Sequence, residues 1–212
     1  MTITTNLCYN VYMQTDYSMN TKQDLLDLPL KPARVDAVST YVDEYLSKKE
    51  TRWLATHGLV YTTNGITKCM AAWHAVAKYC PWHTTDSTVC LVSVGEGAKP
   101  TVSAMFSRLT RWRCLMIDPL LYKRWRGIPS TLPSLICDYG LPMSFNGDKV
   151  VLLSINAHVD LDWYHHQFLA PQMLTVAIPC HVQQIIANRE PTASYIDYGI
   201  AAGRNEVLVW NG

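Results

Sequence analysis

The sequence predicts an α/β fold built on a doubly wound, mostly parallel sheet, with an antiparallel strand pair at its C-terminal end. After residue 34, helical and strand-like patterns alternate along the chain, which is typical of this class. The strand candidates are short and almost continuously apolar, as expected for strands that are buried on both faces. Several of them stop at Gly, Asp or Asn, and ligands of such sheets bind just outside the carboxyl ends of the strands.

The composition fits one soluble globular core. The chain has 212 residues, of which 49% are hydrophobic and 17% charged, and this excludes a disordered or collagen-like protein. Its longest apolar runs are much shorter than a membrane-spanning helix, so no membrane partner is expected. A formal net charge of +1 gives no overall attraction to polyanions, so any interaction with nucleic acid must come from local clusters.

The elements follow in order. Residues 1–33 are polar and end in two closely spaced prolines, which predicts an arm or flap and leaves residues 34–212 as the single domain. Apolar residues at three- and four-residue spacing predict amphipathic helices over 34–48 and 67–79. Further helices are expected over 101–110, 162–169 and, as a short one, 181–187. The expected strands are residues 88–94, 113–117, 134–137, 149–155 and 174–178, followed by a terminal pair at 194–198 and 206–210.

The most informative motif is the strand-to-helix turn VSVGEGAKPT at residues 92–101. Gly95 and Gly97 allow a sharp turn and a close approach of the backbone to a ligand. Asp118 follows the next strand, where its carboxylate could accept both ribose hydroxyls of an adenosine. Pro100 replaces the third glycine of the dinucleotide fingerprint, which disfavours NAD or FAD. A glycine turn without any ligand is the plainer alternative.

These residues resemble those of a known family. VSVGEGAKPT followed by MIDP is similar to motif I and the next acidic position of the class I S-adenosylmethionine-dependent methyltransferases. ICDYG and SINAHVD resemble the third and fourth strand ends of that family, although Asp138 could equally be a solvated turn residue. The resemblance covers about residues 65–212 and implies a Rossmann-like sheet of seven strands, with S-adenosylmethionine as cofactor and S-adenosylhomocysteine as product. The cofactor-binding residues it implies are Val94, Gly95, Glu96, Gly97, Lys99, Pro100, Asp118, Pro119, Asp138 and Asn156.

A basic and aromatic segment suggests the substrate. Seven of the eighteen basic residues lie between Lys99 and Arg126, with tryptophan and tyrosine interleaved, as in proteins that bind single-stranded RNA or a cap nucleotide. A solvated basic face with inward-packed tryptophans is the alternative. Two tyrosines near the C-terminus could border a guanine pocket or pack in the core. The expected contacts to capped RNA are Arg108, Arg111, Lys123, Arg124, Trp125, Arg126, Tyr195 and Tyr198.

The expected chemistry requires no base. Family members that methylate a ribose 2′-hydroxyl resemble one another in a Lys-Asp-Lys-Glu tetrad, but this chain has no lysine after Lys149. Guanine N7 already carries a lone pair, so holding the methyl group in line with it suffices. We therefore expect guanine-N7 methylation, with Asn156, His158 and Asp160 orienting the substrate and no residue transferring a proton. His165 and His166 are adjacent and cannot share a helix face, so no metal site is expected.

More narrowly, the chain resembles the RNA cap guanine-N7 methyltransferases of ronivirus-type nidoviruses. That resemblance implies a domain of a viral replicase polyprotein in the host cytoplasm, with other replicase subunits as possible partners. Four alternatives stay open: a cap ribose 2′-O-methyltransferase, a methyltransferase of a protein or small molecule, an inert Rossmann-like module that binds RNA or a protein partner, and, most distantly, a nicotinamide-dependent oxidoreductase.

Overall fold

The computed structural model describes residues 32–60, 62–127, 131–132, 134–139, 147–180, 184–201 and 204–212. The chain divides into two units, residues 1–30 and 31–212, and every element below belongs to the second unit. The arm predicted over residues 1–33 lies almost entirely outside the described residues.

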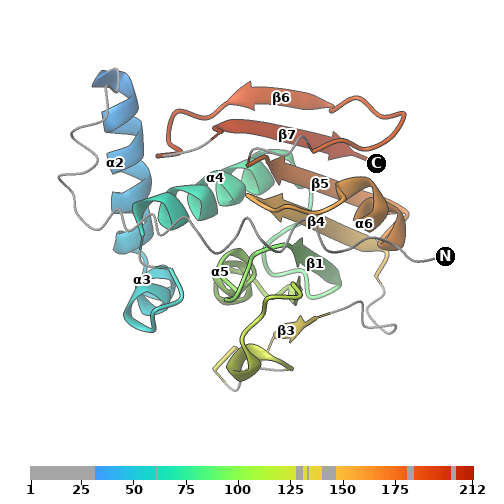
Figure 1. The fold of residues 1–212 in the computed structure, drawn as a ribbon, viewed down its shortest axis with the longest axis horizontal. Helices are drawn as coiled ribbons and strands as arrows, with labels where there is room; N and C mark the ends of the chain where they lie inside the picture. The colour runs from blue at the N-terminus through green and yellow to red at the C-terminus, as the bar shows by residue number, and fades with distance from the viewer. Residues whose placement is uncertain are drawn as a thin grey trace. The chain divides into compact units, whose positions relative to one another are not determined.

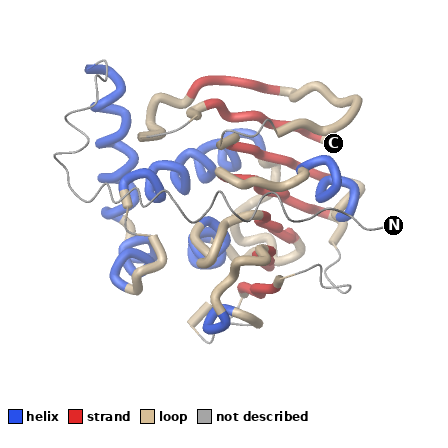
Figure 2. The backbone as a smooth tube through the Cα atoms, viewed as in Figure 1, coloured by secondary structure: helices blue, strands red, loops and turns tan. Residues whose placement is uncertain are grey.

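A seven-stranded sheet forms the centre of this unit, with strand order β3-β2-β1-β4-β5-β7-β6 (Figures 1 and 2). Strands β1 to β5 run parallel to one another, and β7 pairs antiparallel with both β5 and β6. The fold class predicted from the sequence is therefore confirmed, including the C-terminal antiparallel pair. The strands are β1 (Val89–Val94), β2 (Arg113–Ile117), β3 (Leu135–Asp138), β4 (Lys149–Ile155), β5 (Gln172–Ile178), β6 (Ala193–Ile196) and β7 (Glu206–Asn211).

Helices cover both faces of the sheet. The helices α4 (Thr63–Tyr79) and α5 (Val102–Leu109) pack on one face, where the larger cluster of buried side chains includes Phe106 and Trp112. The helices α2 (Pro32–Ser47) and α3 (Lys49–Thr56) pack against α4 and α5 respectively. The second core cluster contains Leu161, the first residue of the short helix α6 (Leu161–Gln167), and Phe168, which follows its last residue. A single 3-10 turn, η1 (Lys123–Trp125), follows β2.

Three elements differ from the prediction. Helix α3 was not expected, because eight residues give only two turns and too few apolar positions for a helical period. Helix α4 begins four residues earlier than expected, since the Thr62 side chain accepts the Gly65 amide hydrogen and caps it.

The short helix expected over 181–187 is wrong for its described part. Residues 184–187 are not helical, and Ile186 instead forms an isolated antiparallel bridge with Arg189. The reason is that Gln184 is buried and its side chain bonds to the end of β4, which holds this stretch in an irregular path. Residues 181–183 lie outside the described part of the chain.

Candidate functional site

The glycine turn and Asp118 meet at the carboxyl ends of β1 and β2. The register pairs Val94 with Ile117, so the residues after these two strands are neighbours. The Gly97 amide donates to Asp118 Oδ2 at 2.6 Å, and the Leu120 amide donates to Oδ1 at 2.7 Å. Asp118 is only 5% exposed. The structure thus brings together the two features on which the sequence analysis relied.

The two glycines serve different purposes. Both have positive φ, 71° for Gly95 and 85° for Gly97. A Cβ at Gly95 would lie 2.5 Å from the Ala157 Cβ and 2.9 Å from Val159 Cγ1, so this glycine allows the turn after β4 to pack on the turn after β1. A Cβ at Gly97 would meet nothing within 4 Å. Open space therefore lies beside the amide that bonds to Asp118.

Glu96 has its carboxylate turned toward helix α5. The carboxylate accepts amide hydrogens from Thr101, from Val102 at 2.8 Å and from Ser103 at 2.9 Å. Burial raises the pKa of Glu96, although these hydrogen bonds act in the opposite direction. The side chain fixes the glycine turn to the start of the helix that follows it.

Other residues of this loop also anchor it. Lys99 Nζ donates to the Gly58 carbonyl at 2.8 Å, which ties the loop to the end of α3. Val94 and Pro100 are buried, whereas Pro119 is exposed beyond β2.

Asp138 ends the neighbouring strand β3. Its backbone carbonyl accepts the Asp118 amide hydrogen at 3.1 Å, so the two acidic residues are adjacent at the same edge of the sheet. Its side-chain Oδ1 accepts the amide of Tyr139 at 2.6 Å, and the side chain is half-buried. Asp138 is therefore the last residue of β3, with one carboxylate oxygen in a local turn bond, and its contact with a cofactor stays a prediction.

The turn after β4 carries three predicted orienting residues. Asn156 has φ of 57° and is exposed, as is His158. Asp160 Oδ1 accepts the Trp163 amide hydrogen at 3.1 Å and caps helix α6. Asn156 and His158 are thus exposed at this edge of the sheet, while the side chain of Asp160 is bonded to the start of α6.

Sequence reasoning missed Lys68, on the second turn of α4. Its side chain is buried, only 6% of the residue is exposed, and Nζ donates to Asn156 Oδ1 at 2.5 Å. Burial lowers the pKa of Lys68, which the charge of Cys180 partly counteracts. From the sequence we expected a helix from Thr67 onward but assigned no role to Lys68. A lysine inside an otherwise apolar stretch, KCMAA, was the only available signal.

Gln184 also went unnoticed. Its amide oxygen accepts from the Ser154 hydroxyl at 2.9 Å, and its amide nitrogen donates to the carbonyl of Ala157 at 3.2 Å. It is 2% exposed. Gln184 therefore holds the turn after β4 in the conformation that packs against Gly95.

The structure separates the predicted RNA-binding residues. Arg111 lies just before β2, whereas Lys123, Arg124 and Trp125 form η1 beyond the other end of that strand. The Arg108 guanidinium lies 4.2 Å from the centroid of the Trp53 ring, against α3. Arg126 stacks on Tyr139, 3.4 Å from the ring centroid, beside β3. Only the η1 segment lies near the glycine turn, since the Tyr122 amide donates to the Ala98 carbonyl at 3.0 Å.

Tyr195 and Tyr198 lie at the opposite edge of the sheet, on and just after β6. The start of η1 is bonded to the loop after β1, and with strands about 4.8 Å apart the four spacings from β1 to β6 amount to roughly 19 Å. One nucleotide therefore cannot contact both η1 and these tyrosines.

The described residues show neither a cluster of metal ligands nor a membrane-spanning helix. The described part of the chain contains no group of three or more His, Cys, Asp or Glu side chains placed to hold a metal ion. His165 is instead buried between Thr175 and Arg189, at 3.1 Å and 3.0 Å from its two ring nitrogens. No helix among the described residues has the length and apolar character needed to cross a membrane.

The sequence matches no protein-family model and no curated protein. Among solved structures, the chain is similar to MtNAS in complex with MTA and tNA, with 11% identity over 90% of this chain and 80% of that one, at a TM-score of 0.47. It is also similar to phosphoethanolamine N-methyltransferase 1 of Haemonchus contortus in complex with phosphoethanolamine and S-adenosylhomocysteine. That match has 10% identity over 84% of this chain and 48% of the other, with a TM-score of 0.44. The case for a function therefore rests on this chain's own residues.

Proposed function

We propose that this protein transfers the methyl group of S-adenosylmethionine to N7 of the guanosine that caps an RNA. The observation that carries the proposal is the glycine turn at 95–97 held against the buried carboxylate of Asp118. Both lie at the carboxyl edge of the parallel strands, where ligands of this fold class bind.

The residues present fit an adenosyl amino acid. An ionised carboxylate has about four acceptor positions, and the Asp118 carboxylate uses two of them on backbone amides. Two positions therefore stay available for the ribose hydroxyls. The open space beside Gly97 leaves room for the ligand, and Asp138 lies one strand further along, where it would meet the adenine.

For this reaction the protein has to position the methyl group and the guanine, and it needs no catalytic base. In the transfer, the bond between sulfur and the methyl carbon breaks, its electron pair stays on sulfur, and the guanine N7 lone pair forms the new bond. The positive charge moves from sulfur to the guanine, and no proton is released at N7. We assign Asn156 and His158 to orienting the guanine, and the basic turn η1 to the RNA phosphates.

The resemblance to cap methyltransferases of ronivirus-type nidoviruses supports the finer proposal that the RNA is viral. The protein would then act in the replication complex in the host cytoplasm, next to other replicase subunits.

A transfer assay with radiolabelled S-adenosylmethionine tests the proposal. We expect label on GpppA-RNA and none on RNA whose cap is already methylated at N7. Digestion to the cap dinucleotide then locates the methyl group. Incorporation that persists on the pre-methylated cap would contradict N7 as the acceptor.

A second candidate, methylation of the ribose 2′-hydroxyl, is favoured by Lys68. A hydroxyl must lose its proton, and a buried amine with a lowered pKa is suited to accept one. The pH dependence of the rate separates the two reactions. With a lysine base, the rate rises with pH until the amine is neutral, whereas N7 transfer needs no base and its rate stays flat over that range.

Calorimetry with S-adenosylhomocysteine tests the cofactor independently of any substrate. We expect heat of binding for the unmodified chain. Its absence would favour a module without methyl-transfer activity that binds RNA or a protein partner. Binding without transfer to any capped RNA would favour a protein or small-molecule substrate.

A further inference from the structure

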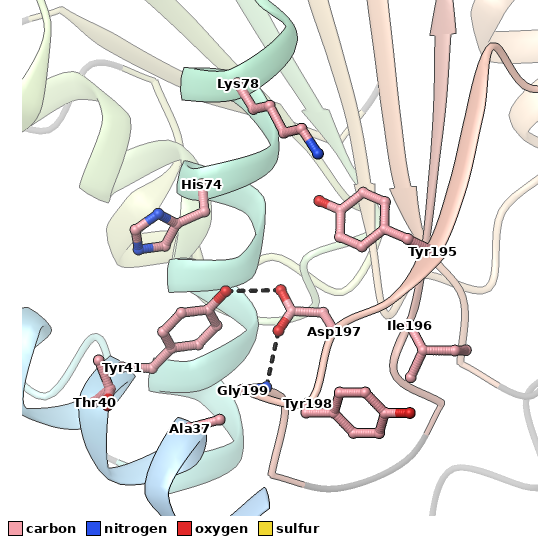
Figure 3. Close-up of a pocket in the computed structure, with 10 residues that line it drawn as sticks. All are labelled: Ala37, Thr40, Tyr41, His74, Lys78, Tyr195, Ile196, Asp197, Tyr198 and Gly199. Carbon is pink, nitrogen blue, oxygen red and sulfur yellow. Dashed lines mark hydrogen bonds between the residues drawn. The ribbon is translucent and has the colours of Figure 1, made fainter. Parts of the chain in front are cut away.

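A second hollow lies far from the glycine turn, between helices α2 and α4 and the chain that leaves β6. Its volume is about 590 Å³, within the range of sites for small ligands. Figure 3 shows Tyr41 from α2, His74 and Lys78 from α4, and Tyr195 to Gly199 around it.

The walls of this cavity are held by hydrogen bonds. Tyr41 Oη donates to Asp197 Oδ2 at 2.8 Å, and Asp197 Oδ1 accepts the Gly199 amide hydrogen at 2.8 Å. The Tyr41 ring stacks on His74 with centroids 5.1 Å apart, and His74 Nε2 lies 2.7 Å from a Glu44 carboxylate oxygen. The cavity is thus a built feature that joins two helices to the edge of the sheet.

The lining of the cavity combines tyrosine rings with the ammonium group of Lys78. Tyr195 and the 60% exposed Tyr198 offer ring faces, and burial raises the pKa of Tyr195 to about 12, which keeps its hydroxyl neutral. Lys78 is exposed, and its Nζ lies 5.3 Å from the Tyr195 ring centroid. Within the described residues, Lys78 has no carboxylate at ion-pair distance, unlike His74 beside Glu44.

Rings for stacking beside an ammonium group that lacks a carboxylate partner among the described residues match the chemistry of a nucleotide, in which a flat base adjoins a phosphate. The described residues that line the cavity include no Asn, Gln or Arg, the side chains that most often read a base edge with two hydrogen bonds, so we expect no preference for one base. We propose that this cavity is a sequence-tolerant site for one nucleotide of single-stranded RNA, distinct from the methyl-transfer site.

The distance of the cavity from the methyl-transfer site shows which part of the RNA it could bind. Strand β6 lies four strand spacings from β1, or roughly 19 Å, so a nucleotide bound here cannot also be the methyl acceptor. The site would hold the RNA some nucleotides away from the cap. This inference rests on the proposed function, because the RNA bound in the cavity is the substrate of the methyl transfer.

Anisotropy of a short fluorescein-labelled single-stranded RNA, titrated with the full chain, tests the site. We expect Tyr198→Ala to weaken RNA binding at least about fivefold, and Tyr198→Phe to keep the wild-type affinity because the ring remains. Lys78→Ala should weaken binding and lower the slope of log affinity against log salt by about 0.7, as one phosphate contact is lost. Lys49→Ala, at an exposed lysine on α3, is the matched control and should change neither.

The outcomes separate this inference from the proposed function. Unchanged RNA affinity in Tyr198→Ala and Lys78→Ala would overturn the site alone, while S-adenosylhomocysteine binding and methyl transfer persist. Weaker binding of GMP but not of RNA in these variants would also overturn it, by showing a mononucleotide site. Absence of RNA binding by the unmodified chain would overturn both proposals. S-adenosylhomocysteine binding should be the same in every variant.

Discussion

At the scale of single residues, Gly95 and Gly97 form a natural comparison because both have positive φ but different surroundings. Gly97→Ala should cost about 1–2 kcal/mol, for the backbone conformation alone. Gly95→Ala should cost about 1–3 kcal/mol more, because its Cβ would collide with Ala157 and Val159. Chemical denaturation of the two variants measures both costs. Equal destabilisation would show that the turns after β1 and β4 are not in close contact.

Substitution of Asp118 tests whether the cofactor binds at the predicted site. We expect Asp118→Ala to weaken S-adenosylhomocysteine binding by about ten- to a hundredfold, since hydrogen bonds to a charged group contribute about 1.5–3 kcal/mol. Asp138→Ala should have a smaller effect, because Asp138 is only half-buried and water competes for its hydrogen bonds more than at the buried Asp118. Calorimetry gives both affinities, and the thermal midpoint of each variant checks that it is folded. A larger loss in Asp138→Ala would contradict the assignment.

The position of a site residue could be predicted from the sequence only where the residue directly follows a predicted strand. The sequence shows that Gly95, Gly97 and Asp118 follow consecutive strands, and parallel pairing then forces them together. It does not show which way a side chain turns, so Glu96 was assigned to the cofactor although its carboxylate faces α5. Lys68 was missed because its burial depends on where α4 begins.

At the scale of elements, the role of Glu96 as an anchor for helix α5 is testable. Glu96→Ala should lower the free energy of unfolding by about 0.5–2 kcal/mol, because amides at the start of the helix lose their acceptor. Denaturant melts measure this loss. Glu50→Ala, in the first turn of α3, is a control that leaves the glycine loop unchanged. An equal loss in both variants would deny Glu96 a special role.

Elements with a clear period were predictable, and those built by tertiary contacts were not. The strands β1, β4 and β5 are nearly continuous apolar runs, so the sequence alone located them. Helix α3 has too few apolar residues to show a period. The chain around Gln184 seemed helical by local pattern, but a buried amide bonded to β4 overrides that pattern.

At the scale of the whole molecule, the order of strands decides which residues can act together. From the sequence we expected both the residues of η1 and the two tyrosines, Tyr195 and Tyr198, to contact the capped RNA. The structure places η1 beside the loop after β1 and the two tyrosines at β6, four strand positions away. Strand order is not readable from local patterns, since it depends on long-range pairing. RNA that contacts both η1 and these tyrosines must therefore extend across the carboxyl ends of the strands.

The hydrogen bonds of His165, which join α6 to β5, make the stability of the fold depend on pH. Arginine only donates hydrogen bonds, so Arg189 Nη1 donates to His165 Nε2, and His165 Nδ1 then donates to Thr175. This arrangement requires a neutral ring. Burial lowers the pKa of His165, and the nearby charge of Arg189 lowers it further.

The sign of the effect follows from that shift. The unfolded chain binds a proton at His165 near pH 6.5, whereas the folded chain resists protonation until a lower pH. The contribution of His165 to stability is therefore complete above pH 6.5 and is lost as the pH falls through its lowered folded pKa. Thermal midpoints between pH 8 and pH 5 should fall for the unmodified chain and fall less for His165→Gln. His166→Gln, at the neighbouring exposed histidine, should follow the unmodified chain, and a flat profile for all three would show that folding does not shift the pKa of His165.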